Sequence, residues 1–116
     1  MEFGTFAFGS IQIDGSTFEH DVVIDGGRVR KRKKGPSKVL RGRYGHTPLT
    51  PAEDIPWACR RLVVGTGAAG SLPVTDELVL EAERRHVELV TMPTAEAIEA
   101  LRAASADTNA ILHVTC

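Results

Sequence analysis

The sequence predicts a single α/β domain built on a mixed β-sheet, and two contrasting halves of the chain carry that prediction. In the first half, apolar and polar residues alternate on both sides of tight turns, which is typical of antiparallel hairpins. In the second half, short runs of branched apolar residues alternate with segments of helical periodicity, which is typical of parallel strands joined by helices. We therefore expect N-terminal antiparallel hairpins, then a C-terminal β-α-β-α-β unit, with helices packed on the sheet.

Length and composition fit one domain spanning residues 1–116. The chain has 42% hydrophobic and 25% charged residues, as ordinary globular domains do. A domain of this size buries about two thirds of its unfolded surface, so it needs neither disulfides nor a structural metal. Its two cysteines are expected to be free thiols in a reducing compartment. With no secretory leader and no apolar run of membrane-spanning length, we expect a soluble cytoplasmic protein without membrane contact.

The N-terminal hairpins are predicted from two turn signals. Alternating residues from Phe6 to Ile13 precede Asp14-Gly15, and a second run follows from Thr17 to Ile24. The turn Asp25-Gly26-Gly27-Arg28 then leads to a third strand beginning at Val29. On the second strand one face is expected to be solvated, because it carries Glu19 and Asp21, whereas the opposite face carries Phe18, His20, Val22 and Ile24.

The middle of the chain carries mixed signals. Gly35-Pro36-Ser37 is typical of a loop. Thr50-Pro51-Ala52-Glu53 matches a capping box with proline at the first helical position, and we expect a helix of one or two turns limited by Pro56. Trp57 is expected to be a core or lid aromatic. The sequence leaves open whether Trp57 and the segment Tyr44–Thr50 cover the glycine-rich loop described below.

The second half predicts three buried strands and two helices. The strands are Leu62–Val64, Val87–Met92 and Ala110–Val114. Thr75 is the expected N-cap of the first helix, with acidic residues in its first turn and basic residues in its last, and Thr94 is the expected N-cap of the second helix. Glu81 and Arg85 add an i,i+4 pair to the first helix, and Ile98, Leu101 and Ala104 or Ser105 form the apolar stripe of the second.

The stretch Gly65 to Ser71 is the candidate ligand site, because glycines follow a predicted strand. The G-x-G-x-x-G match does not predict dinucleotide binding, since the helix begins only at Thr75. A P-loop is excluded because Ser71 stands where its lysine belongs. What remains is a small-ligand or anion site using Gly65, Thr66, Gly67, Gly70 and Ser71, with a charged side chain supplied from elsewhere. The alternative is that the glycines only permit a tight turn and close packing.

His113, Thr115 and Cys116 form a second candidate group at the end of the sequence. A thiol needs a nearby base to become a nucleophile, but alternate residues of a strand share a face, so His113 should face Thr115 rather than Cys116. We therefore assign no catalytic residue. His20, His46, His86 and His113 show no metal-ligand spacing, so neither a metal nor a cofactor is expected.

A basic segment is the third candidate. Nine of the 14 Lys and Arg residues lie between Arg28 and Arg43, with no acidic residue among them. A candidate interaction surface consists of Arg28, Arg30, Lys31, Arg32, Lys33 and Lys34. If all six met phosphates, the log–log salt slope of nucleic-acid binding would be about −5. The segment has no interleaved aromatics for base stacking, and a lysine-protected strand edge is the commoner explanation.

Several stretches taken together resemble the adipogenesis-associated Mth-type domain family. They are Leu62-Val63-Val64-Gly65-Thr66-Gly67, Leu72-Pro73, Leu89-Val90, Pro93-Thr94-Ala95-Glu96-Ala97 and Leu112-His113-Val114-Thr115-Cys116. The resemblance implies a compact domain with helices on a mixed sheet. The family includes a mitochondrial branch that acts as a respiratory complex I assembly factor, and functionally undefined stand-alone prokaryotic members. The matching positions of interest are Gly65, Gly67 and His113 to Cys116.

Three functions follow as hypotheses. The favoured one is a non-catalytic protein-interaction or assembly module with a protein partner of unknown identity. The second is a small-ligand or anion-binding protein, or an enzyme, that uses the loop from Gly65 to Gly70. The third, less favoured, is nucleic-acid binding through the basic run from Arg28 to Lys34.

Overall fold

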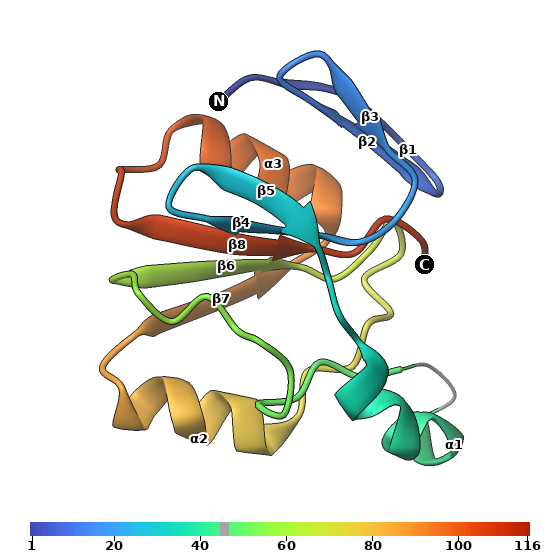
Figure 1. Ribbon diagram of the computed structural model, residues 1–116, viewed down its shortest axis with the longest axis vertical. Helices are drawn as coiled ribbons and strands as arrows, with labels where there is room; N and C mark the ends of the chain where they lie inside the picture. The colour runs from blue at the N-terminus through green and yellow to red at the C-terminus, as the bar shows by residue number, and fades with distance from the viewer. Residues whose placement is uncertain (45–46) are drawn as a thin grey trace.

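Two β-sheets and three α-helices make up the computed structural model, which describes residues 1–44 and 47–116 (Figure 1). The chain forms, in order, β1 (Phe3–Ala7), β2 (Ser10–Ile13), β3 (Ser16–Phe18), β4 (Val22–Asp25), β5 (Arg28–Lys31), the 3₁₀ helix η1 (Gly35–Leu40), α1 (Arg41–Tyr44), β6 (Arg61–Gly65), α2 (Asp76–Arg84), β7 (Glu88–Met92), α3 (Thr94–Arg102) and β8 (Thr108–Leu112). The fold class is therefore the expected one: a compact α/β domain with a mixed sheet.

The large sheet has the strand order β5-β4-β8-β6-β7, and the small sheet has the order β1-β2-β3. Strand β6 pairs in parallel with both β7 and β8, whereas β4 pairs antiparallel with β8 and β5. The C-terminal β-α-β-α-β unit is thus confirmed. The N-terminal strands divide between the two sheets: the β4–β5 hairpin extends the large sheet, whereas β1 to β3 form a sheet of their own.

Three layers result, since both faces of the large sheet are covered (Figure 1). Helix α3 and the small sheet lie on one face, and α2 with the segment around Leu49 and Ile55 lies on the other. Within β6, Val63 joins the α3 core, whereas Leu62 and Val64 join the α2 core. Burial of both faces explains why β6 is a continuous apolar run without polar alternation.

Helix α2 begins and ends as expected. The Thr75 hydroxyl accepts a hydrogen bond from the Leu78 amide at 3.3 Å, which caps the helix. Arg85 donates to Glu81 at 2.7 Å across one turn. Helix α3 differs, because its N-cap is Pro93 and Thr94 is its first residue. The Thr94 hydroxyl instead bonds other segments, as described below.

Two expectations for the N-terminal half were wrong. Residues 6–13 do not form one strand, because the chain turns at Gly9, where φ is 88°. The run from Thr17 to Ile24 is also two strands: β3 lies in the small sheet and β4 in the large one. The chain changes sheets at Glu19–Asp21, and Asp21 is buried rather than solvated. Alternation specifies the faces of a strand but carries no signal for a change of partner strand.

The middle segment also departs from expectation. Gly35–Leu40 is a 3₁₀ helix rather than a loop. The helix predicted at Thr50 does not form. Residues 51–53 make a turn instead, in which the Thr50 hydroxyl accepts from the Ala52 amide at 3.3 Å and the Thr50 carbonyl accepts from the Glu53 amide at 3.3 Å. The capping box fails because the Glu53 carboxylate binds a buried arginine instead of returning to the helix start.

Candidate functional site

Arg32 is the centre of a buried polar cluster. It follows β5 directly, and because the side chains of a strand alternate, Arg32 turns inward where Lys31 points to solvent. Its Nε and one terminal nitrogen donate to the two carboxylate oxygens of Glu53, both at 2.8 Å. The guanidinium also donates to Asp21 at 2.9 Å and to the Pro48 carbonyl at 3.0 Å. Since Arg32 is only 4% exposed, it is not part of the predicted interaction surface.

Ser37 and Thr50 complete this cluster on the other side of Glu53. The Ser37 hydroxyl donates to the Glu53 carboxylate at 2.6 Å and lies 2.7 Å from the Thr50 hydroxyl. All three residues are buried. These bonds tie η1 to the turn after Thr50, which explains why neither segment has the structure expected from its local sequence.

Asp21 links the cluster to the last residues of the chain. Its carboxylate oxygens lie 2.8 and 3.0 Å from Nδ1 of His113, and one of them accepts from the Val114 amide at 2.9 Å. The other ring nitrogen of His113, Nε2, lies 3.1 Å from the Thr115 hydroxyl. The expectation that His113 faces Thr115 is therefore confirmed, and the order of contacts is carboxylate, imidazole, hydroxyl.

Contacts within the cluster shift the pKa values of Asp21 and Arg32. Burial by itself raises the pKa of Asp21, but the hydrogen bond and charge of His113, together with the Val114 amide and Arg32, lower that pKa to about 2. Burial by itself lowers the pKa of Arg32, but Glu53 and Asp21 outweigh it and raise the pKa above its ordinary value. Both shifts favour the charged forms of Asp21 and Arg32 at neutral pH. Buried ionised groups persist only when paired in this way.

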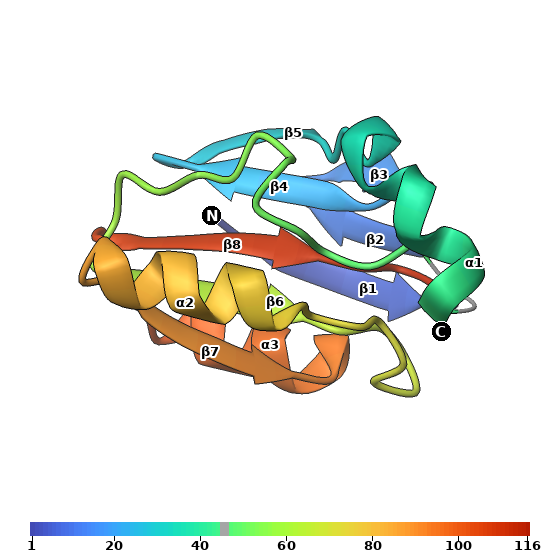
Figure 2. The same ribbon diagram turned by 90° about the horizontal axis from the view of Figure 1, so that it is seen from below.

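A small pocket of about 150 Å³ opens beside this cluster, and its lining combines two groups that lie far apart in the sequence. The residues that line it are Arg32, Lys34, Arg41, Thr47, His113 and Thr115. It lies beyond the carboxyl end of β8, where ligands of open α/β sheets bind, and both views place α1 and the C-terminus at that end (Figures 1 and 2). We call it the basic pocket.

The glycine-rich loop lies near the same end of the sheet, but its amides already have acceptors within the protein. Thr66 N donates to the Met92 carbonyl, Gly67 N to the Thr94 hydroxyl and Ala68 N to the Thr115 carbonyl, at 2.7 to 2.8 Å. The Gly70 and Ser71 amides donate to the carbonyls of Gly67 and Cys116, at 3.3 and 2.8 Å. These engaged amides support the alternative role of the glycines, in turn formation and packing.

Two glycines are needed for close packing. Gly67 has a φ of 104°, and a Cβ there would overlap the backbone of Cys116. A Cβ on Gly65 would lie 2.9 Å from both Leu112 and the Thr94 hydroxyl. The glycines therefore let the residues after β8 cross directly over the loop. Thr94 joins these segments, because its hydroxyl also donates to the His113 carbonyl at 2.7 Å.

The last residues of the chain bond to one side of the loop, through the Thr115 and Cys116 carbonyls, while Ala68 to Ser71 remain exposed. Trp57 packs in the α2 core, with the Arg85 guanidinium 5.1 Å from its ring centroid. Within the segment Tyr44–Thr50, Thr47 lines the basic pocket and Leu49 is fully buried. Gly45 and His46 lie outside the described residues.

The remaining basic residues do not form one continuous binding group. Arg28, Lys31, Lys33 and Lys34 are exposed. Arg30 is half-buried and donates to the Asp54 carbonyl at 2.8 Å. Of the six residues proposed from the sequence, only Lys34 and the buried Arg32 line the basic pocket.

The cysteines and histidines suggest no further centre in residues 1–44 and 47–116. No group of three His, Cys, Asp or Glu side chains there could hold a metal ion. Burial raises the pKa of the Cys59 thiol, which donates to the Pro56 carbonyl at 3.4 Å. Cys116 is half-buried and lies beyond the Thr115 hydroxyl that contacts His113.

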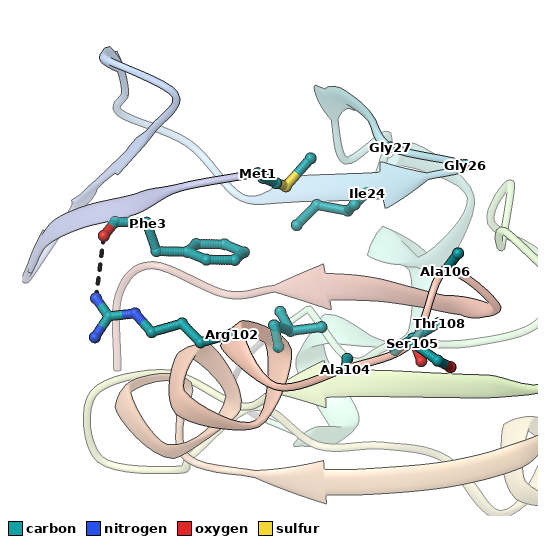
Figure 3. Close-up of a pocket in the computed structure, with 11 residues that line it drawn as sticks. Met1, Phe3, Ile24, Gly26, Gly27, Arg102, Ala104, Ser105, Ala106 and Thr108 are labelled. Carbon is teal, nitrogen blue, oxygen red and sulfur yellow. Dashed lines mark hydrogen bonds between the residues drawn. The ribbon is translucent and has the colours of Figure 1, made fainter.

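A second pocket, of about 350 Å³, lies between the start of the chain, β4 and the end of α3 (Figure 3). Phe3, Ile24 and Leu101 supply apolar surface, and Ser105 and Thr108 supply hydroxyls. Its one charged side chain, Arg102, already donates to the Phe3 carbonyl at 3.0 Å and to Glu99 at 2.8 Å. This pocket therefore lacks the uncommitted charged groups that the basic pocket has.

Sequence reasoning missed Asp21, Glu53 and Arg41 as site residues. Asp21 was assigned to a solvated strand face, and Glu53 to a helix cap. One signal was available in the sequence. The basic run contains no acidic residue, so its buried members need carboxylates from elsewhere, and Asp21 and Glu53 each lie next to apolar residues. That signal indicates pairing but does not identify the partners.

Fold and site together define a three-layer α/β domain with a small basic pocket at the carboxyl end of its central strand. The conserved hypothetical protein PH1505 from Pyrococcus horikoshii OT3 is 32% identical to this chain, over 100% of both chains, with a TM-score of 0.84. The chain belongs to the same family as PH1505.

Two further solved structures share the fold. MT938 is 24% identical over 98% of this chain and 97% of its own, with a TM-score of 0.71. A protein from Bordetella parapertussis is 21% identical over 97% and 93%, with a TM-score of 0.64. Neither a protein-family model nor a curated protein matches the chain. Among the described residues, no helix combines the length and apolar character needed to cross a bilayer.

Proposed function

We propose that this protein is a small binding module whose basic pocket accepts an anionic group of the size of a carboxylate or phosphate. The observation that carries the proposal is the lining of the pocket, where Lys34 and Arg41 meet His113 and Thr115. Its volume of about 150 Å³ is below the roughly 300 to 1,000 Å³ of pockets that enclose drug-sized ligands. Only a small ion, or one group of a larger partner, fits.

The buried cluster prepares this pocket for binding. Arg32 is fixed by Glu53 and Asp21, and His113 is fixed by Asp21. The pocket side chains held by the cluster therefore lose little conformational freedom when a ligand binds, which favours affinity. Lys34 and Arg41 are exposed and have no charge partner among the described ion pairs, so their charge is available to a ligand.

The anionic group has two sources, a free small ion or an acidic side chain of a protein partner. The second source agrees with the favoured hypothesis of an interaction or assembly module and with the resemblance to the Mth-type domain family, membership of which we also propose. A cytoplasmic location is part of the same proposal, supported by the finding that neither Cys59 nor Cys116 forms a disulfide among the described residues.

A titration followed by amide NMR shifts tests the proposal, with acetate, inorganic phosphate and a glutamate-rich peptide as three separate probes. We expect shifts centred on the backbone of Lys34, Arg41 and His113 to Thr115. The double variant Lys34→Gln and Arg41→Gln should weaken binding at least about tenfold, because a hydrogen bond to a charged group contributes about 1.5–3 kcal/mol.

The matched control is Lys31→Gln with Lys33→Gln, which removes the same charge from exposed positions outside the pocket. Equal weakening by both double variants would show that only net charge matters and would overturn the proposal. Shifts centred on Gly65 to Ser71 instead would support the glycine-loop hypothesis. Saturation by the peptide but not by acetate or phosphate would show that the anionic group belongs to a protein partner.

Nucleic-acid binding through the basic run is less well supported. Arg32 is neutralised within the protein and Arg30 donates to the Asp54 backbone. The four residues that remain exposed give a log–log salt slope of about −3.6 at most, and a low-salt gel-shift titration measures it.

A further inference from the structure

The contacts of Asp21, His113 and Thr115 have the order and spacing of an activated nucleophile. The Thr115 hydroxyl lies 3.1 Å from His113 Nε2, and His113 Nδ1 lies 2.8 Å from the Asp21 carboxylate. A hydroxyl within about 2.6 to 3.2 Å of a base that a third group orients is the signature of nucleophilic catalysis. The same order of groups occurs in hydrolases of unrelated folds.

The three groups differ in exposure as nucleophilic catalysis requires. Asp21 and His113 are both only 9% exposed, so the orienting carboxylate and the base are shielded from solvent. Thr115 is half-buried and lines the basic pocket, so its hydroxyl is accessible from the pocket. Because Asp21 accepts at Nδ1, that nitrogen carries the proton in the neutral ring, and Nε2 is left to accept the Thr115 proton.

We propose that Thr115 is a nucleophile that accepts a short acyl group from a small carboxylic ester, with His113 as the general base and Asp21 as its positioning residue. The inference rests on the proposed anion-binding function of the same pocket. The cations that would hold a carboxylate there, Lys34 and Arg41, would also stabilise the oxyanion formed from the ester carbonyl. The pocket volume of about 150 Å³ limits the acyl group to a few carbon atoms.

The reaction balances with water as the only co-reactant. Thr115 Oγ forms a bond to the carbonyl carbon and gives its proton to His113 Nε2, and the carbonyl π electrons move to oxygen. When the intermediate collapses, the ester C–O bond breaks and the leaving alkoxide takes the proton from Nε2. Water then attacks the acyl-threonine, His113 takes its proton and returns it to Thr115 Oγ, and the acid is released.

Acylation by 4-nitrophenyl acetate tests the inference on the full chain. Nitrophenolate release is followed by absorbance, and tandem mass spectrometry locates the acetyl group. We expect an acetyl group on Thr115 in the wild type and in the Cys116→Ala variant, which removes the neighbouring thiol. His113→Gln should slow acylation of Thr115 by about 10² to 10⁴. Thr115→Ser should retain acylation, and Thr115→Val should abolish it.

Thermal melting and acetate titration of each variant separate this inference from the binding proposal. If folded wild-type protein binds acetate but carries no acetyl group on Thr115, the nucleophile inference is wrong and the binding function stands. If none of acetate, inorganic phosphate and the glutamate-rich peptide binds, the binding proposal is wrong. Acylation of Thr115 at equal rates in wild type and in folded His113→Gln would exclude His113 as the base.

Discussion

The most informative single change is Arg32→Met, because Arg32 was expected on the surface and lies in the core. Methionine keeps much of the side-chain length but removes the guanidinium, its two bonds to Glu53, its bond to Asp21 and its bond to the Pro48 carbonyl. Glu53 then remains buried without a cation, and Asp21 keeps only His113 and the Val114 amide as partners. We expect this to destabilise the protein far more than the loss of a surface charge would.

The expected loss of stability follows from the burial of Arg32 and its two carboxylate partners. The side chains of Arg32 and Glu53 are 2% and 3% exposed, and that of Asp21 is 9% exposed. Removing one partner from a buried ion pair costs about 3–5 kcal/mol. A domain of this kind has a free energy of unfolding of about 5–15 kcal/mol, so the variant should lose a large fraction of its stability.

Urea unfolding at pH 7, followed by the fluorescence of Trp57, measures the loss. With a urea dependence of about 2 kcal/mol per molar, a loss of about 4 kcal/mol lowers the midpoint by about 2 M. The control Lys31→Met removes the adjacent, exposed charge and should change stability by less than about 0.5 kcal/mol. A difference between the two variants below about 1 kcal/mol would refute the reasoning.

The same comparison at lower pH gives an independent check. In Arg32→Met, Glu53 and Asp21 should take up protons more readily than in the wild type, because both lose the charge and the hydrogen bonds of Arg32. The stability gap between the variant and the wild type should therefore narrow between pH 7 and pH 5. A gap of constant size over that range would show that the carboxylates are not buried beside Arg32.

Three further outcomes are expected. Asp21→Asn should lower stability at pH 7 by about 2 kcal/mol, because the pKa of Asp21 falls from 3.8 to about 2 on folding and each pH unit corresponds to about 1.4 kcal/mol. Because the folded-state pKa is depressed, this contribution is present above about pH 4 and is lost as the pH falls towards 2. Gly67→Ala should destabilise by about 1–3 kcal/mol through its positive φ and its contact with the chain end, whereas Gly42→Ala should not destabilise. Thr94→Val should cost about 2–3 kcal/mol because it leaves a buried amide and a buried carbonyl without a partner, whereas Thr91→Val on the exposed face of β7 should be near neutral.

Thermal and urea unfolding of all five variants provide the measurements. An Asp21→Asn deficit that stays the same from pH 7 to pH 2 would contradict the assigned pKa. Equal stability of Gly67→Ala and Gly42→Ala would show that the chain end does not pack against the loop. A Thr94→Val variant as stable as Thr91→Val would mean that its hydroxyl does not join α3 to the loop and to β8.

Local patterns were sufficient for much of the fold. Apolar runs predicted the strands β6, β7 and β8, and Thr75 with its acidic first turn predicted the start of α2. Strands β6 and β8 are buried as expected, whereas β7 is only partly buried, because it lies at the edge of the large sheet. These features depend on residues near one another in the sequence. The capping box at Thr50 does not form because of a contact between residues far apart in the sequence: Glu53 binds Arg32, which is 21 residues away.

The sequence predicted only separate parts of the site. His113 and Thr115 were candidates because they are two residues apart, and that spacing correctly placed them on one face. Lys34 and Arg32 were candidates because they belong to a basic run, although burial separates their roles. Asp21 could not be assigned, because its partner His113 is 92 residues away and a lone carboxylate in a strand is equally compatible with a solvated face.

The sequence by itself therefore determined the α/β class and the β-α-β-α-β unit, since these depend on local periodicity. Only the tertiary structure decided that the basic run and the last residues of the chain meet in one pocket. It also decided which charges are buried there. The physical reason is that ion pairs and hydrogen bonds between distant segments have no periodicity, so they exist only once β4, β5 and β8 are aligned in the large sheet.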